Sequence, residues 1–142
     1  MPVPKIFPGL ATALKDAQEH MQQNTAYITG LRDALRNGLD KIDGAGFNGS
    51  REHCLPGTVN YSFQGVNGET LLSLLSNEGI CCSSGSACSA GSLEPSHVLL
   101  ALGLSHETAK SALRFSLCEY NTMDEVQTII TKVTEAVNRL RR

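Results

Sequence analysis

The segment SSGSACSAGS, residues 83–92, surrounds the single thiol of Cys88 with small residues, and a thiol is the strongest nucleophile among ordinary side chains. The alanine and serine neighbours leave the sulfur open to a ligand. The serines and glycines give the backbone little preference for one conformation. Composition alone therefore supports two interpretations equally: a reactive cysteine on a mobile loop, or a flexible surface loop in which Cys88 has no role.

A cysteine reacts as the thiolate, which a nearby cation or a helix N-terminus favours. No charged residue lies between Gly79 and Leu93, and the flanking residues Glu78 and Glu94 would oppose ionisation. Activation of Cys88 must come from the helix expected to begin near Pro95, from a cation brought close by folding, or from a group outside the chain.

Metal binding is the competing chemistry for this region, because Cys81, Cys82, Cys88 and His97 are all potential ligands. Their spacing argues against it. Adjacent cysteines point to opposite faces of an extended chain, and there is no pair of C-x-x-C motifs. We expect no metal site, Cys81 as a core residue of a short strand, and His97 as a solvated or helix-capping side chain. The other histidines and cysteines show no ligand pattern: His20, His53, His106, Cys54 and Cys118. We expect the two cysteines among them to be structural.

Arg114 is the second residue that could do chemistry, since a guanidinium on an apolar strand can donate two hydrogen bonds to one carboxylate. On the sequence alone a salt bridge on an edge strand is the favoured interpretation, and a carboxylate-binding site is the alternative. The arginines of the C-terminus, Arg139, Arg141 and Arg142, are expected to be solvated and to interact with a helix dipole.

Apolar residues recur at helical spacing over the first 40 or so residues, which predicts one long amphipathic helix or two helices joined near Asn24. The opening MPVPKIFPG contains Pro2, Pro4 and Pro8 and is expected to be an extended lead-in. The residues that form the apolar pattern are Leu10, Ala13, Leu14, Ala17, Met21, Ile28, Leu31, Leu35 and Leu39.

The rest of the chain alternates between strand and helix signals. Thr122 and Glu125 form a capping box for the final helix, Ser105 can cap a short helix, and Pro95 is expected in the first turn of another. The expected strands are at Phe47, 59–63, 80–82 and 113–117. The expected helices are a short one with its apolar stripe from Leu71 to Leu75 and its end at Gly79, one over 96–102, a short one after Ser105, and a last one whose apolar pattern runs from Val126 to Leu140.

This order of elements predicts an α+β fold, in which helices flank a small antiparallel sheet and a long helix precedes it. With 142 residues the chain is the size of one domain. We expect residues 1–43 to form the lead-in and a long connecting helix, and residues 44–142 to form a small domain.

Composition limits the possible partners. The chain has 41% hydrophobic and 18% charged residues and a net charge of -2, which gives no electrostatic reason to bind nucleic acid or anionic lipid. No apolar run approaches the length of a membrane helix, and no secretory signal is visible. Five cysteines are an odd number and suit reduced thiols. We therefore expect a cytoplasmic protein whose partners are proteins or small molecules.

Four stretches carry a resemblance to a known family: LPGTVNYSF (55–63), NGETLLSLLSNEGICCSSGSACSAGSLEPSHVLLALGLS (67–105), LRFSL (113–117) and EYNT (119–122). They resemble the C-terminal part of pyridoxal-phosphate-dependent cysteine desulfurases of the NifS/IscS type. SSGSAC followed by SLEPSHVLLALG is highly specific. The lead-in VPKIFPGLATAL is similar to the segment where the family's long helix leaves its large cofactor-binding domain. The implied fold is the C-terminal domain of a fold-type I enzyme.

The resemblance implies that the full-length enzyme takes sulfur from L-cysteine, releases alanine and leaves a persulfide that passes to a sulfur-acceptor or scaffold protein, as in iron-sulfur cluster assembly. Cys88 matches the persulfide-forming cysteine of SSGSAC. Arg114 matches the arginine of RFSL that binds the substrate carboxylate. One departure is visible, because family members usually have glycine at the position of Cys118.

The family's cofactor lysine has no counterpart in this chain. We therefore expect pyridoxal phosphate in the full-length enzyme, none bound to this chain, and no desulfurase activity from the chain alone. A selenocysteine lyase domain and a stand-alone sulfur carrier or interaction domain remain as alternatives. Exposed apolar surface on the first helix, and hence a homo-oligomer such as a dimer, is also expected. The lysines that match no cofactor motif are Lys5, Lys15, Lys41, Lys110 and Lys132.

Overall fold

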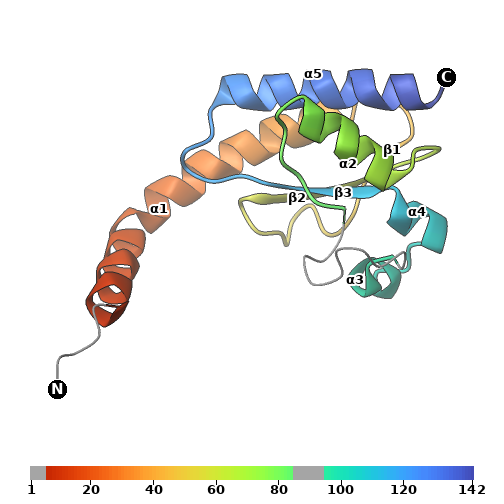
Figure 1. Cartoon of the computed structure of the whole chain (residues 1–142). Helices are drawn as coiled ribbons and strands as arrows, with labels where there is room; N and C mark the ends of the chain where they lie inside the picture. The colour runs from red at the N-terminus through yellow and green to blue at the C-terminus, as the bar shows by residue number, and fades with distance from the viewer. Residues whose placement is uncertain (1–5, 85–94) are drawn as a thin grey trace.

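The computed structural model describes residues 6–84 and 95–142, so Cys88 and its loop lie outside the described residues. Figure 1 shows a small helix-covered sheet from which one long helix extends towards the N-terminus. The α+β class expected from the sequence is confirmed. The elements in chain order are α1 (Ile6–Leu39), β1 (Ala45–Phe47), β2 (Thr58–Phe63), α2 (Gly68–Asn77), α3 (His97–Ala101), α4 (His106–Lys110), β3 (Ala112–Ser116) and α5 (Met123–Leu140).

Helix α1 is continuous from Ile6 to Leu39, with no break near Asn24. The extended lead-in expected up to Gly9 is therefore wrong from Ile6 onward. Pro8 is tolerated because it lies in the first turn, where backbone N–H groups have no intrahelical acceptor. Every described residue from Phe7 to Gln23 is exposed, whereas Leu31, Leu35 and Leu39 are buried. Only the C-terminal half of α1 therefore belongs to the packed body (Figure 1).

The sheet is antiparallel, with strand order β1-β2-β3. Phe47 pairs with Tyr61 between β1 and β2, and Asn60 pairs with Arg114 between β2 and β3. Because side chains alternate along a strand, this register assigns one face to apolar residues and the other to polar ones. Val59, Tyr61 and Phe115 are fully or nearly fully buried on the apolar face.

The core lies between the apolar face of the sheet and three helices, α1, α2 and α5. Figure 1 shows α2 and α5 on the same side of the sheet. Helices α1 and α5 approach closely at Gly38, where a Cβ atom would overlap the side chain of Ile130. The helical residues that complete the core are Leu31, Leu35, Leu39, Leu71, Leu75, Val126, Val133 and Val137.

Caps mark several helix ends, and those at Gly79, Ser105 and Thr122 were predicted from the sequence. Asn67 caps α2 through its side chain, and Gly79 follows α2 with φ at +79°. Thr122 and Glu125 form the expected capping box at the start of α5. Ser105 accepts a hydrogen bond from the backbone of Thr108 at the start of α4. Local hydrogen-bonding chemistry therefore fixes these boundaries.

Three expectations near the loop are wrong in detail. Residues 80–82 form no strand, although Ser83 makes an isolated antiparallel bridge to Arg114. Cys81 is exposed rather than a core residue, and Cys82 packs against the core instead. The following helix is shorter than expected, because Ser96 is its N-cap and Pro95 precedes the cap rather than lying in the first turn.

Candidate functional site

The polar face of the sheet carries the described residues of greatest chemical interest. Asn60 and Ser62 alternate with the buried side chains of β2, and Arg114 and Ser116 alternate with those of β3. Helix α4 and Ala112 cover the end of this face near Ser62. Arg114 and Ser116 are exposed at the other end. The face therefore offers an open polar surface around Arg114.

Arg114 lies on β3, which is an edge strand as the sequence suggested. The salt bridge expected there is absent within residues 6–84 and 95–142, where the guanidinium of Arg114 has neither an ion pair nor a hydrogen bond. The side chain is exposed. Its charge is therefore not committed to any described carboxylate and is available to an anionic ligand.

The backbone of Arg114 is bonded to Ser83, which precedes the segment that contains Cys88. The amide of Arg114 donates to the carbonyl oxygen of Ser83 at 2.7 Å, and the amide of Ser83 donates to the carbonyl of Arg114 at 3.0 Å. Ser83 precedes Cys88 by five positions in the sequence. The described chain before Cys88 is thus fixed to Arg114 at Ser83, while the role predicted for Cys88 itself stays a prediction.

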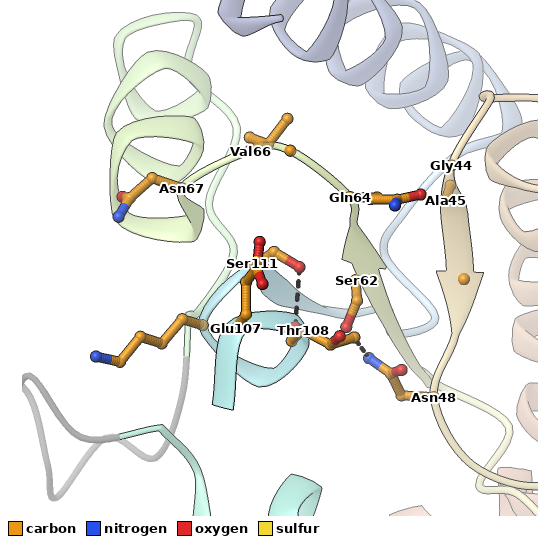
Figure 2. Close-up of a pocket in the computed structure, with 13 residues that line it drawn as sticks. Gly44, Ala45, Asn48, Ser62, Gln64, Val66, Asn67, Glu107, Thr108 and Ser111 are labelled. Atoms are coloured by element: carbon orange, nitrogen blue, oxygen red, sulfur yellow. Dashed lines mark hydrogen bonds between the residues drawn. The ribbon is translucent and has the colours of Figure 1, made fainter. Parts of the chain in front are cut away.

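A hydrogen-bonded group of polar side chains lies on the same face. The Nδ2 atom of Asn48 donates to Oδ1 of Asn60 at 2.7 Å and to Oγ of Ser62 at 2.8 Å. Figure 2 shows Asn48 and Ser62 pointing towards one another. Ser62 is buried, with 4% of its surface exposed. The backbone amide of Asn48 also donates to the carbonyl of Asn60, at 2.9 Å, so this group is fixed through both backbone and side chain.

A pocket of about 750 Å³ opens next to this group, between the β1–β2 edge and α4 (Figure 2). Ser111, on its wall, is buried and fully engaged: its Oγ accepts from the amide of Phe63 at 3.2 Å and donates to the carbonyl of Thr108 at 2.8 Å. The lining residues are Gly44, Ala45, Gly46, Asn48, Ser62, Gln64, Gly65, Val66, Asn67, Glu107, Thr108, Lys110 and Ser111.

The described residues do not fit pyridoxal phosphate in this pocket. Lys110 is the one lysine on its wall, but the lining offers no aromatic ring for stacking and no arginine for a phosphate. The nearby N-terminus of α2 is already capped by Asn67 and carries Glu69 in its first turn, which would repel a phosphate. The described residues that line this pocket therefore support no cofactor step.

Lys132 is not suited to bond covalently to a carbonyl cofactor. Its Nζ lies 3.1 Å from Oε2 of Glu78 and 3.4 Å from Oε2 of Glu135. The hydrogen bond to Glu78 and the charge of Glu135 raise the pKa of Lys132. A lysine that bonds covalently to a carbonyl cofactor needs the opposite shift, because the neutral amine is the nucleophile.

The described cysteines differ in environment. Burial raises the pKa of Cys82 to about 11, with a further contribution from the neighbouring Cys81. Cys54 is half-buried and its sulfur lies 3.3 Å from Nη1 of Arg32. Cys118 is exposed, 3.5 Å from Oδ1 of Asn121. Among the described residues, His, Cys, Asp and Glu side chains nowhere gather in a group of three suited to a metal ion.

Sequence reasoning singled out Arg114 but missed its surroundings. Asn60 and Ser62 were recognisable as the polar side of an alternating strand. Their position beside Arg114 depends on the register of β2 against β3, which no local pattern contains. Asn48 could not have been found, because it reaches Asn60 only through the pairing of β1 with β2.

Comparisons with known proteins point to one family. The family model for aminotransferase class-V matches residues 2–129. The cysteine desulfurase IscS of Mannheimia succiniciproducens is 46% identical over 133 residues, which are 94% of this chain and 32% of that protein. A cysteine desulfurase of Nostoc sp. is 43% identical over 134 residues, 94% of this chain and 34% of that protein.

Solved structures give the same result. A NifS-like protein superposes with a TM-score of 0.80 at 34% identity, covering 92% of this chain and 32% of its own. The chain thus spans about one third of the length of the relatives that it matches.

Proposed function

This chain belongs to the aminotransferase class-V family, and from that premise we propose that it is the C-terminal part of a pyridoxal-phosphate-dependent cysteine desulfurase. In this proposal residues 44–142 form the small domain, and residues 1–43 form the lead-in and connecting helix. The relatives reported above carry the name cysteine desulfurase, which favours L-cysteine over selenocysteine as the substrate.

Two residues carry the proposed chemistry. Arg114 binds the carboxylate of L-cysteine through its guanidinium, and Cys88 accepts the substrate's sulfur as a persulfide while alanine is released. The thiolate of an acceptor protein then attacks the outer sulfur, the S–S bond breaks, and Cys88 leaves as a thiolate. Iron-sulfur cluster assembly is one process that consumes sulfur in this form.

The observation that carries the proposal is the state of Arg114. The residue is exposed, its guanidinium has no ion pair among the described residues, and its backbone bonds to Ser83, from which the chain continues towards Cys88. A salt bridge would have explained the arginine structurally. An uncommitted cation, whose backbone bonds to a residue five positions before a cysteine, suits a substrate that has both a carboxylate and a sulfur atom.

Pyridoxal phosphate belongs, in this proposal, to the part of the protein outside this chain. When bound, it would supply the electron sink that weakens the carbon–sulfur bond of the substrate. The chain alone is then inactive.

In the same proposal, the part of the protein outside this chain covers the exposed apolar side of α1, so the isolated chain self-associates. Reliance on a free thiol suits a reducing compartment, and we place the enzyme in the cytoplasm.

Complementation tests the proposal. The chain is fused in frame to the cofactor-binding portion of a class-V cysteine desulfurase, and alanine release from L-cysteine is measured. We expect activity from the fusion and none from the isolated chain with added pyridoxal phosphate. Cys88→Ser should abolish alanine release, whereas Cys118→Ser, which removes an exposed thiol elsewhere in the chain, should retain it.

Two results would contradict this assignment. Alanine release by the isolated chain would show that it is not inactive alone. Alanine release by a fusion that carries Cys88→Ser would show that Cys88 is not the residue that accepts the sulfur. An inactive fusion, combined with selective persulfide formation on Cys88 of the isolated chain, would instead support a stand-alone sulfur carrier.

A further inference from the structure

We propose that Asn60 is a substrate-binding residue: its side-chain amide donates, next to the guanidinium of Arg114, to the carboxylate of the amino-acid substrate, and Asn48 holds that amide in orientation. The inference rests on the proposed function, because it assumes that Arg114 binds this carboxylate. It adds a second donor and the residue that positions it.

The ladder geometry brings Asn60 and Arg114 together. They are register partners on β2 and β3, and their side chains lie on the same polar face. In an antiparallel strand the N–H and C=O of one residue point to the same side. Those of Arg114 are both bonded to Ser83, on the side away from β2. Asn60 and Arg114 therefore form a non-hydrogen-bonded pair, the arrangement in which opposite side chains come closest.

Asn48 determines which atom Asn60 presents to a ligand. Oδ1 of Asn60 accepts from Nδ2 of Asn48 at 2.7 Å, so the oxygen of this carboxamide is already engaged. Nδ2 of Asn60 has no hydrogen bond within the described residues, and it is not among the buried unsatisfied atoms there. The amide therefore presents its donors, rather than its acceptor, to the accessible side.

Ser62 completes this orientation. Nδ2 of Asn48 donates its second hydrogen to Oγ of the buried Ser62, at 2.8 Å, so both hydrogens of Asn48 are used and its amide cannot rotate without loss (Figure 2). Asn60 is itself half-buried. A donor held in this way loses little conformational entropy when a ligand binds.

The two donors complement one another chemically. A carboxylate accepts about four hydrogen bonds, and a guanidinium fork satisfies only two of them. Arg114 supplies the charge from a long and exposed side chain that no described partner holds. Asn60 supplies a hydrogen-bond donor that is held in position on a short side chain. Together they would bind and orient an amino-acid carboxylate, and they would discriminate against a thiol that lacks one.

The test uses the full 142-residue chain in solution. Titration with L-cysteine under reducing conditions is followed by ¹⁵N NMR at the side-chain Nδ2 of Asn60 and the Nε of Arg114. We expect both signals to shift with one common dissociation constant. Cysteamine, which has the same thiol and amine without the carboxylate, should shift neither.

Variants separate binding from folding. Asn60→Ala should raise the dissociation constant read at Arg114 by about tenfold, the effect of one hydrogen bond to a charged group. Asn60→Asp should abolish the response, because a carboxylate there repels the ligand and pairs with Arg114. Ser116→Ala, on the same exposed face, is the matched control and should leave the constant unchanged. Backbone spectra report whether each variant is folded.

The outcomes distinguish this inference from the function on which it rests. A shift of Arg114 with no shift of Asn60, or unchanged affinity in folded Asn60→Ala, overturns the role of Asn60 and leaves that of Arg114 intact. If neither residue responds to L-cysteine, the carboxylate-binding role of Arg114 is contradicted as well.

Discussion

At the scale of single residues, Cys81 and Cys82 are neighbours with opposite surroundings. Cys81 is exposed, whereas Cys82 packs against the core and burial raises its pKa to about 11. Alkylation requires the thiolate and access to it. At pH 7.5 we expect iodoacetamide to modify Cys81 and to spare Cys82, as measured by peptide mass spectrometry. Equal alkylation rates at the two positions would show that Cys82 is not protected by the fold.

Asp40 is the acidic centre of a network at the end of α1. Its carboxylate accepts two hydrogen bonds of 2.8 Å from Arg51 and one of 2.6 Å from the hydroxyl of the fully buried Tyr61. The hydrogen bond from Arg51, followed by that from Tyr61, lowers the pKa of Asp40 in spite of partial burial. A lowered folded-state pKa means that ionised Asp40 stabilises the native state.

This stabilisation should disappear in acid. It is fully present above the unfolded-state pKa of about 3.9 and is lost as the pH falls through the lower folded value. We expect Asp40→Asn to reduce the free energy of unfolding at pH 7 by about 1 kcal/mol, and the difference from wild type to shrink towards pH 3. Urea titrations at the two pH values measure it. A difference that grows in acid would contradict this sign. Asp16→Asn, on the exposed part of α1, is the control.

Residue-level prediction from the sequence succeeded where a local pattern carried the information. The alternating residues of 113–117 form a strand as predicted, with the exposed Arg114 on one face and the buried Phe115 on the other. Whether Arg114 had a carboxylate partner could not be read from that pattern, because the answer depends on which residues pack beside β3. The exposure of Cys81 was missed for the same reason.

At the scale of elements, the contact between α1 and α5 depends on Gly38. A Cβ there would overlap Ile130, a branched and therefore stiff side chain. Gly30, on the same helix, has open space around its Cα. The two glycines form a matched pair that separates intrinsic helix propensity from packing.

We expect opposite effects from the same substitution. Gly30→Ala should raise the free energy of unfolding by about 0.5–1 kcal/mol, since alanine favours a helix over glycine. Gly38→Ala should lower it by about 1–3 kcal/mol, because overpacking against Ile130 exceeds that gain. Thermal unfolding followed by circular dichroism measures both. Stabilisation by both substitutions would contradict the close packing of α1 on α5.

Elements were predictable where capping or periodicity specified them. The capping box of Thr122 and Glu125 and the valine pattern of α5 are both present as expected. Residues 80–82 have strand-like composition but form no strand, because only Ser83 obtains a bridging partner on β3. Pro8 led to the opposite error: it suggested an extended segment, but proline is tolerated in the first turn of a helix, and Pro8 lies there.

At the scale of the whole molecule, the N-terminal half of α1 carries apolar side chains at helical spacing without a described partner. Phe7 and Leu14 are 60% and 62% exposed, and Leu10 and Met21 lie on the same stripe. No helix in the described ranges is long and apolar enough to cross a membrane. Exposed apolar stripes of this kind are typical of contact surfaces.

We expect the isolated chain to self-associate through this stripe. Leu14→Glu should shift sedimentation equilibrium towards monomer while the free energy of unfolding changes little, because the exposed half of α1 lies outside the core. Gln22→Glu adds the same charge to the same helix away from the stripe and should leave association unchanged. A wild-type chain that stays monomeric at every concentration, or equal effects of both substitutions, would contradict this role for the stripe.

For the whole molecule, the proposed carrier of sulfur is one thiol, Cys88, in the segment that follows Ser83, where the chain is bonded to Arg114. Incubation of the chain with a persulfide donor, followed by mass spectrometry of its peptides, tests this role. We expect one added sulfur atom on Cys88 and its absence from Cys88→Ser. Sulfur spread evenly over the five cysteines would contradict it.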